Sequence, residues 1–133
     1  LMVEDDAEMC EELIPILEEE GYLIDVAHDG KSAIIQVEKD DFGLVLLDLK
    51  MPKINGYEVL KYIKRSHPNM KVIVLSGSPL RPGMLKAEEQ IFPGGKDYQQ
   101  LISQLADGFI NKPFEIEQLI AAVHKILPKP EEQ

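Results

Sequence analysis

A carboxylate, a hydroxyl or an amine stands at the end of each of four apolar stretches in this chain. The residues in question are Glu4, Asp5, Asp48, Ser76 and Lys112. A buried carboxylate costs free energy unless a cation or a hydrogen-bond donor pairs with it. An acid that ends an apolar run, as Asp48 ends residues 44–47, therefore needs a partner from elsewhere in the chain.

These side chains could together hold a phosphoryl group. Carboxylates within ~4 Å of one another repel by about 4 kcal/mol per pair at a surface-like dielectric, so either some are protonated or a cation lies among them. Oxygen ligands without Cys or His favour Mg²⁺ or a similar hard ion such as Mn²⁺. Lys112 would add a fixed positive charge and Ser76 a hydroxyl donor, with Asp48 as the nucleophile.

Two periodicities alternate along the sequence and predict the elements that position these residues. Apolar runs predict buried strands, and apolar residues at helical spacing predict helices between them. This alternation is typical of an α/β fold with a parallel sheet, helices on both faces and right-handed crossovers. In such sheets the functional site lies outside the carboxyl ends of the strands, where the strand order reverses. The predicted strands cover residues 1–3, 22–27, 42–47, 71–75 and 108–111, and the predicted helices cover residues 9–17, 32–39, 57–65, 98–105 and 115–127.

Composition narrows the class of protein. With 133 residues, 44% of them apolar, the chain suits one domain with one core. The single cysteine, Cys10, excludes a disulfide framework and is expected to be a packed or half-exposed thiol in a reducing compartment. The formal charge of −10 argues against nucleic-acid binding by this domain. No apolar stretch approaches the ~18 residues that span a bilayer and no export signal opens the chain, so we expect a cytoplasmic location without membrane contact.

Five ordered segments resemble the receiver domain of response regulators in two-component signalling. They are MVEDD (2–6), EEEGY (18–22), LVLLDLKMPKINGYEVL (44–60), KVIVLSG (71–77) and GFINKPF (108–114). The resemblance implies a single doubly wound (βα)5 flavodoxin-like sandwich with a five-stranded parallel sheet. It also implies that Asp48 accepts a phosphoryl group from a histidine kinase or a histidine phosphotransfer protein, with Mg²⁺ or Mn²⁺ as cofactor.

The resemblance assigns roles to further residues. Asp5 would bind the metal directly, Glu4 through water, and Lys50 through its backbone carbonyl. The spacing to Gly21 matches the family with Glu4 and Asp5 as the acidic pair, so Asp6 is expected to cap the first helix. Lys50 and Ser78 occupy positions that modulate hydrolysis of the acyl phosphate in the family. The peptide bond before Pro113 would be cis.

The same resemblance implies a conformational switch. The hydroxyl of Ser76 would turn toward the phosphoryl group, and Phe109, three residues before Lys112, would swing inward. The altered surface would be that of the fourth helix, fifth strand and fifth helix, where a partner or a second copy binds. From sequence alone, Phe109 is equally well read as a core residue.

The expected domain covers residues 1–127, and residues 128–133 form a tail or the start of a linker. The stretch between Ser76 and Lys112 is roughly a dozen residues longer than the family usually has, and we assign the extra length to residues 79–95, as a mobile or partly helical flap. The chain starts inside its first strand, so we expect a domain of something longer. The parent is a regulator cut at its linker or a hybrid sensor histidine kinase.

Four functions compete. The first is a phosphorylatable switch that catalyses its own phosphorylation and dephosphorylation, without being a classical enzyme. The second is a docking module that works without phosphorylation. A dehalogenase-like phosphohydrolase would need a second Asp two positions after Asp48, where Lys50 stands. A carrier of flavin mononucleotide would need a hydroxyl- and glycine-rich loop where the acidic residues 4–6 stand.

Overall fold

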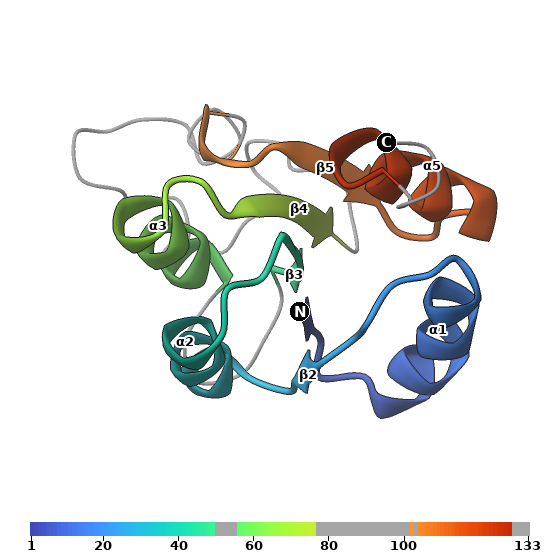
Figure 1. The fold of residues 1–133 in the computed structure, drawn as a ribbon, viewed down its shortest axis with the longest axis horizontal. Helices are drawn as coiled ribbons and strands as arrows, with labels where there is room; N and C mark the ends of the chain where they lie inside the picture. The colour runs from blue at the N-terminus through green and yellow to red at the C-terminus, as the bar shows by residue number, and fades with distance from the viewer. Residues whose placement is uncertain (50–55, 77–101, 103, 129–133) are drawn as a thin grey trace, which may run out of the picture.

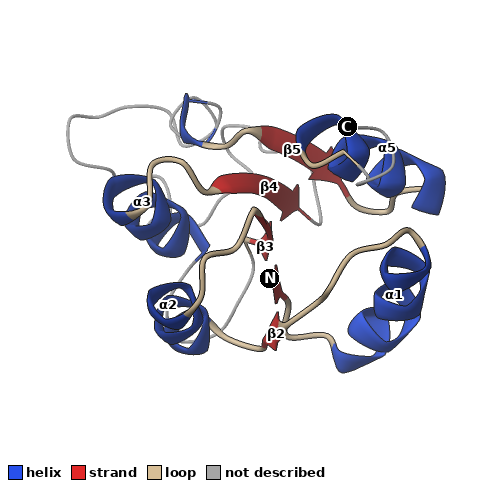
Figure 2. Cartoon of the chain, in the orientation of Figure 1, coloured by secondary structure: helices blue, strands red, loops and turns tan. Residues whose placement is uncertain are grey.

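The computed structural model describes residues 1–49, 56–76, 102 and 104–128. Within them, five parallel strands form one sheet in the order β2-β1-β3-β4-β5. Helices α2 and α3 cover one face of the sheet, and α1 and α5 cover the other (Figures 1 and 2). This is the predicted doubly wound, flavodoxin-like α/β fold. The elements are β1 (Met2–Val3), α1 (Ala7–Glu19), β2 (Val26–Ala27), α2 (Gly30–Lys39), β3 (Leu44–Asp48), α3 (Gly56–Ser66), β4 (Lys71–Ser76), β5 (Gly108–Asn111) and α5 (Ile116–Ile126).

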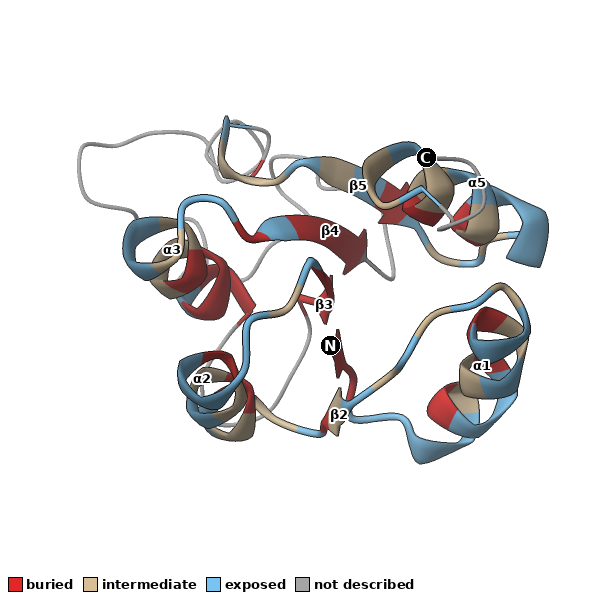
Figure 3. Cartoon of the chain, in the orientation of Figure 1, coloured by how far each residue is buried: buried red, intermediate tan, exposed pale blue. Residues whose placement is uncertain are grey.

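The hydrophobic core lies in two layers because successive side chains of a strand point to opposite faces of the sheet. On β3, Val45 and Leu47 pack toward α2 and α3, whereas Leu44 and Leu46 pack toward α1 and α5. All five residues of β3 are buried, as the unbroken apolar run predicts for a strand covered on both faces (Figure 3).

Local signals fix the ends of the helices. Asp6 caps α1, since its side chain accepts a hydrogen bond of 3.2 Å from the Met9 amide, as predicted. After α1, Gly21 has a φ of +98° and lets the Tyr22 amide reach the Leu17 carbonyl at 3.2 Å. Helix α2 begins at Gly30, two residues before the predicted start, because Asp29 caps it.

The predicted strand over residues 22–27 is wrong for its first four residues. Only Val26 and Ala27 form β2, which is an edge strand. Among the described strands its neighbour is β1, which is only two residues long, and the Met2 amide makes one further bond of 2.8 Å to the Asp25 carbonyl. Leu23 lies before this short ladder and is 97% exposed.

The ends of the remaining elements agree with the prediction to within two residues. Of the predicted helix over residues 98–105, Ile102, Gln104 and Leu105 are helical and the rest lies outside the described residues. The predicted insertion at 79–95 and the residues after 128 also lie outside them. None of the helices in the described part is long and apolar enough to cross a membrane.

The start of β5 is tied to β4 and α3 through Asp107. Its carboxylate accepts hydrogen bonds of 2.9 Å from the Val72 amide and 2.9 Å from the Lys64 amine. The Asp107 amide in turn donates to the Val72 carbonyl at 2.8 Å. These bonds fix where β5 begins and therefore where it ends, at the residue before Lys112.

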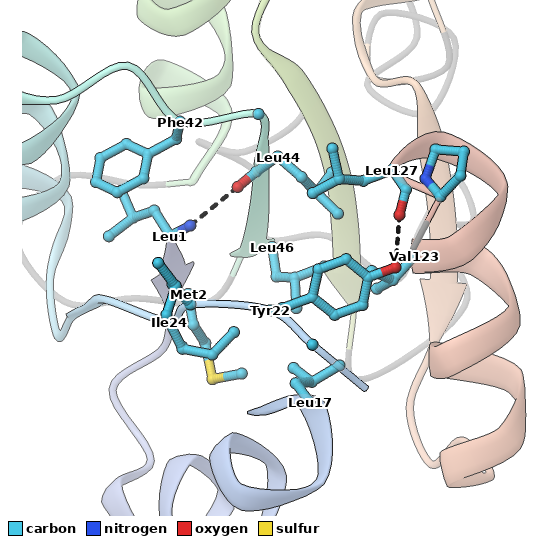
Figure 4. A pocket seen from close by; sticks show the side chains of 14 residues that line it. Leu1, Met2, Leu17, Tyr22, Ile24, Phe42, Leu44, Leu46, Val123 and Leu127 are labelled. Carbon is cyan, nitrogen blue, oxygen red and sulfur yellow. Dashed lines mark hydrogen bonds between the residues drawn. The ribbon is translucent and has the colours of Figure 1, made fainter. Parts of the chain in front are cut away.

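The amino edge of the sheet is apolar. There, an open cavity of about 310 Å³ lies between the start of β3 and the last turns of α1 and α5 (Figure 4). Leu1 donates from its amine to the Leu44 carbonyl at 2.9 Å, and the Tyr22 hydroxyl donates to the Leu127 carbonyl. The side chains labelled around it are Leu1, Met2, Leu17, Tyr22, Ile24, Phe42, Leu44, Leu46, Val123 and Leu127.

Candidate functional site

Charged residues meet at the opposite, carboxyl edge of the sheet. Glu4 directly follows β1, Asp48 is the last residue of β3, and Lys112 directly follows β5. The β1–β3 pair in the middle of the sheet is where the strand order reverses, which is the expected place for a site in a doubly wound fold. Parallel pairing therefore brings residues that are far apart in the sequence to one place.

The Lys112 amine lies between two carboxylates. Its Nζ donates to Glu4 Oε1 at 2.8 Å and lies 3.5 Å from Asp48 Oδ2. Glu4 is 1% exposed and Asp48 is 3% exposed. Within the described part of the chain, the cation that pairs with these two buried carboxylates is Lys112, which is partly exposed itself.

The electrostatics of the cluster shift two pKa values. Burial raises the pKa of Glu4 above its ordinary 4.5, and the neighbouring Asp48 raises it further, while Lys112 acts in the opposite direction. Burial acts to lower the pKa of Lys112, but its contacts with Glu4 and Asp48 outweigh burial and raise it above 10.5. The lysine is therefore held in its charged form by the acids around it.

An oxygen cluster suited to a hard cation is present at the same edge. Carboxylate oxygens of Glu4, Asp5 and Asp48 all lie within 4.8 Å of one another. Asp5 is exposed, whereas the other two acids are buried, so the cluster opens to solvent on the side of Asp5. A donor set of carboxylates without nitrogen or sulfur fits Mg²⁺ or Mn²⁺.

The other predicted site residues lie partly outside the described structure. Ser76 ends β4 opposite Asn111 of β5, and its side chain is not among the described parts. Lys50 and Ser78 also fall outside. Phe109 is on β5 with 39% of its surface exposed, so it is not a core residue here. The Lys112-Pro113 peptide bond is cis, as the family resemblance implied.

Sequence reasoning missed two neighbours of Glu4. His28 has Nδ1 at 3.0 Å from the Glu4 carbonyl oxygen. The buried thiol of Cys10 makes a longer contact of 3.9 Å with the same oxygen, and burial raises its pKa, with Glu4 and Asp6 adding to the shift. The signal for His28 was its place directly after β2, at the edge where the acids gather.

A third missed residue supports the end of β3. Gly56, the first residue of α3, lies so close to β3 that a Cβ there would be 2.4 Å from Leu49 Cα. Its amide donates to the Leu49 carbonyl at 3.1 Å. The lack of a side chain thus lets α3 start against the backbone that carries Asp48.

Comparison with known proteins identifies the family. The sequence model described as "Response regulator receiver domain" matches residues 1–90 of this chain. The chain belongs to the response regulator receiver family. Its five-stranded parallel sheet is the fold of the solved receiver domains that resemble it.

Related proteins agree with this assignment. The receiver domain is 31% identical to the response regulator ArlR of Staphylococcus saprophyticus over 127 residues, which are 96% of this chain and 51% of ArlR. It is 33% identical to the transcriptional regulatory protein CpxR of Escherichia coli K12 over 128 residues, which are 96% of this chain and 48% of CpxR. The chain thus spans about half the length of these relatives.

A solved structure also matches over nearly the whole chain. The response regulator TrrA of Thermotoga maritima, solved in complex with Mg²⁺ and beryllium fluoride, is 30% identical. It superimposes with a TM-score of 0.74, covering 95% of this receiver domain and 96% of TrrA.

Proposed function

We propose that this receiver domain is a phosphorylation-dependent switch in which Asp48 accepts a phosphoryl group from a histidine kinase or a histidine phosphotransfer protein. One observation carries the proposal: Asp48 and Glu4 lie buried around the Lys112 amine, at the strand-order reversal of a response regulator fold. The complex of TrrA with Mg²⁺ and beryllium fluoride supports the same chemistry by similarity.

The side chains divide the work of phosphoryl transfer. A carboxylate oxygen of Asp48 attacks phosphorus and forms a P–O bond, while the P–N bond of the phosphohistidine breaks and its electron pair stays on the imidazole nitrogen. Lys112, held in its charged form, offsets the negative charge of the phosphoryl oxygens. Dephosphorylation is a separate step in which water attacks phosphorus, the P–O bond to Asp48 breaks, and inorganic phosphate leaves with Asp48 restored to its carboxylate.

A divalent ion fits the acidic cluster. Glu4, Asp5 and Asp48 would hold it, with the backbone carbonyl of Lys50 as a further ligand in our proposal. When bound, Mg²⁺ or Mn²⁺ supplies neutralisation of phosphoryl charge and a template for the transfer. Glu4 and Asp5 would hold the ion beside the Asp48 carboxylate, which accepts the phosphoryl group in this proposal.

The output surface is proposed to include β5 and α5. Phe109 is exposed three residues before Lys112, so a change around the phosphoryl group could be passed along one short strand. We propose that Ser76 turns toward the phosphoryl group, that Phe109 then moves inward, and that the fourth helix, β5 and α5 change their surface for a partner, a second copy or an attached output domain.

Acetyl phosphate tests the proposal. Purified protein is incubated with acetyl phosphate, with and without Mg²⁺, and intact mass is followed over time. We expect a phosphoryl adduct that requires Mg²⁺ and is absent in Asp48→Asn. Asp6→Asn is the matched control, because Asn caps α1 as well as Asp does and the variant should label like wild type.

Two outcomes would contradict the proposal. Labelling that persists in Asp48→Asn would place the phosphoryl group elsewhere. A folded wild-type chain that acquires no adduct from acetyl phosphate or from a phosphorylated phosphotransfer protein would favour the docking module instead. Loss of labelling in Asp6→Asn but not in Asp5→Asn would assign the direct metal ligand to Asp6 instead of Asp5.

A further inference from the structure

The peptide groups of Glu4 are held by two consecutive residues at the end of β2. The Glu4 amide donates to the Ala27 carbonyl at 3.0 Å, which continues the β1–β2 ladder by one bond. The Glu4 carbonyl accepts from His28 Nδ1 at 3.0 Å. Any residue can make the first bond, but the second depends on the imidazole of His28.

The partner decides which ring nitrogen carries the proton. A carbonyl oxygen only accepts, so Nδ1 of His28 must be the N–H donor in this contact. Cys10 offers the same oxygen only a thiol at 3.9 Å, which is a weak donor. Among the side chains that the structure describes, only that weak thiol contact to the Glu4 carbonyl would remain without the imidazole.

His28 is itself well anchored. The next residue, Asp29, caps α2 through a bond of 2.7 Å from the Ser32 amide to its carboxylate. The Asp29 carbonyl accepts from the Ala33 amide at 3.1 Å, within the first turn of α2. The imidazole therefore connects the turn after β1 to the fixed start of a helix.

The turn that the His28 imidazole contacts carries two residues of the acidic cluster. The turn after β1 carries Glu4 and Asp5, whose carboxylate oxygens lie within 4.8 Å of those of Asp48. One oxygen of the Glu4 side chain is also engaged by the Asp6 amide at 3.3 Å. A shift of the Glu4 peptide would move both acids relative to Asp48, and metal affinity falls steeply when ligands lose their supporting hydrogen bonds.

We propose that His28 is a positioning residue for Glu4 and Asp5, and that it sets the affinity of the carboxyl edge for a divalent ion. The inference rests on the proposed function only in taking this cluster as the metal site. His28 acts through the Glu4 carbonyl and touches neither the ion nor Asp48.

Substitutions at His28 distinguish the loss of its hydrogen bond from the loss of side-chain volume. The Asn amide nitrogen stands where Nδ1 does, so His28→Asn keeps the donor, whereas His28→Gln places its amide one bond further out and His28→Ala removes it. The control is His67→Ala, which removes a histidine that pairs with Glu38 at 3.0 Å, between α2 and the end of α3. Binding of MnCl₂ is measured by electron paramagnetic resonance of free Mn²⁺, and unfolding of the metal-free variants by circular dichroism.

We expect His28→Ala and His28→Gln to weaken Mn²⁺ binding by about tenfold, the lower end of the effect of losing such a support. His28→Asn and His67→Ala should bind like wild type. Equal affinity in His28→Ala and wild type would overturn the inference, as would a His28→Asn variant as weak as His28→Ala. A wild-type chain that binds no Mn²⁺ would also overturn it, whereas one that binds Mn²⁺ without being phosphorylated would refute the proposed function alone.

Discussion

The two ends of β3 bury opposite kinds of side chain. At its amino end, Leu44 is 7% exposed and lines an apolar cavity with Leu1 and Phe42. At its carboxyl end, Asp48 is buried with Glu4 against Lys112. Burial of apolar surface stabilises a fold, whereas burial of charge costs free energy that one partly exposed lysine offsets only in part. The comparison indicates that the amino end contributes stability, whereas the carboxyl end holds buried charge at a cost in stability.

The largest expected effect on stability comes from a substitution at the amino end of β3. Leu44→Ala removes a buried side chain beside an existing cavity, so the free energy of unfolding should fall by about 2–5 kcal/mol. Urea denaturation followed by circular dichroism measures it. Labelling by acetyl phosphate per folded molecule should stay at the wild-type level, because Asp48 lies at the other end of the strand. A loss of labelling in fully folded Leu44→Ala would show that the two ends are not independent.

The second-largest expected effect on stability comes from replacing Lys112, the cation at the carboxyl end of β3. Lys112→Met removes from Glu4 and Asp48 the positive charge of the amine that contacts both, and we expect the free energy of unfolding to fall by about 1–3 kcal/mol at neutral pH. The loss should depend on pH. Burial and Asp48 already raise the pKa of Glu4 above 4.5, and without Lys112 it rises further, so the folded state holds a proton that the unfolded state has released.

The sign of that dependence is fixed. Stability of Lys112→Met should fall as the pH rises from about 4.5 through the folded-state pKa of Glu4, and the deficit should be smallest at the acid end of this range. Urea denaturation at several pH values from about 4.5 to neutral measures the free energy of unfolding of Lys112→Met and of wild type. A deficit that does not change with pH would mean that Glu4 stays ionised throughout.

Two glycines sharpen the comparison of the ends. Gly56→Ala puts a Cβ 2.4 Å from Leu49 Cα, a backbone atom that cannot move aside, and should cost about 1–3 kcal/mol and slow labelling of Asp48. Gly43→Ala, next to the amino end, meets only the tip of the Leu127 side chain at 3.1 Å. That tip can rotate, so this control should change stability by less than about 1 kcal/mol. Equal costs at the two positions would contradict the packing described for α3.

The smallest expected effect is an increase, not a decrease, in the free energy of unfolding. Asp48→Asn removes one of two carboxylates that face each other, so the free energy of unfolding should rise by about 0.5–2 kcal/mol while labelling disappears. Thermal and urea unfolding measure the change. A strongly destabilised Asp48→Asn would mean that the Lys112–Asp48 contact outweighs the repulsion from Glu4.

Much of the fold was predictable from sequence because its signals are local and repeated. Doubly buried strands such as residues 44–48 are apolar throughout, and parallel pairing then dictates that Glu4, Asp48 and Lys112 meet. Residues 22–25 were mispredicted as strand because strand length depends on the neighbouring strand, which the local sequence pattern does not report. The role of His28 was missed because its partner is a backbone carbonyl, which has no signature in the sequence.

The pairing of Glu4 with Lys112 joins positions 108 apart, near the two ends of the domain. During synthesis the acidic residues emerge first and stay without their lysine until β5, the outermost strand beyond β4, has docked. A chain interrupted before β5 would contain Asp48 but lack Lys112, whose amine lies beside the Asp48 carboxylate. Assembly of the charged carboxyl edge therefore depends on the docking of β5, because only then does the Lys112 amine reach the two carboxylates.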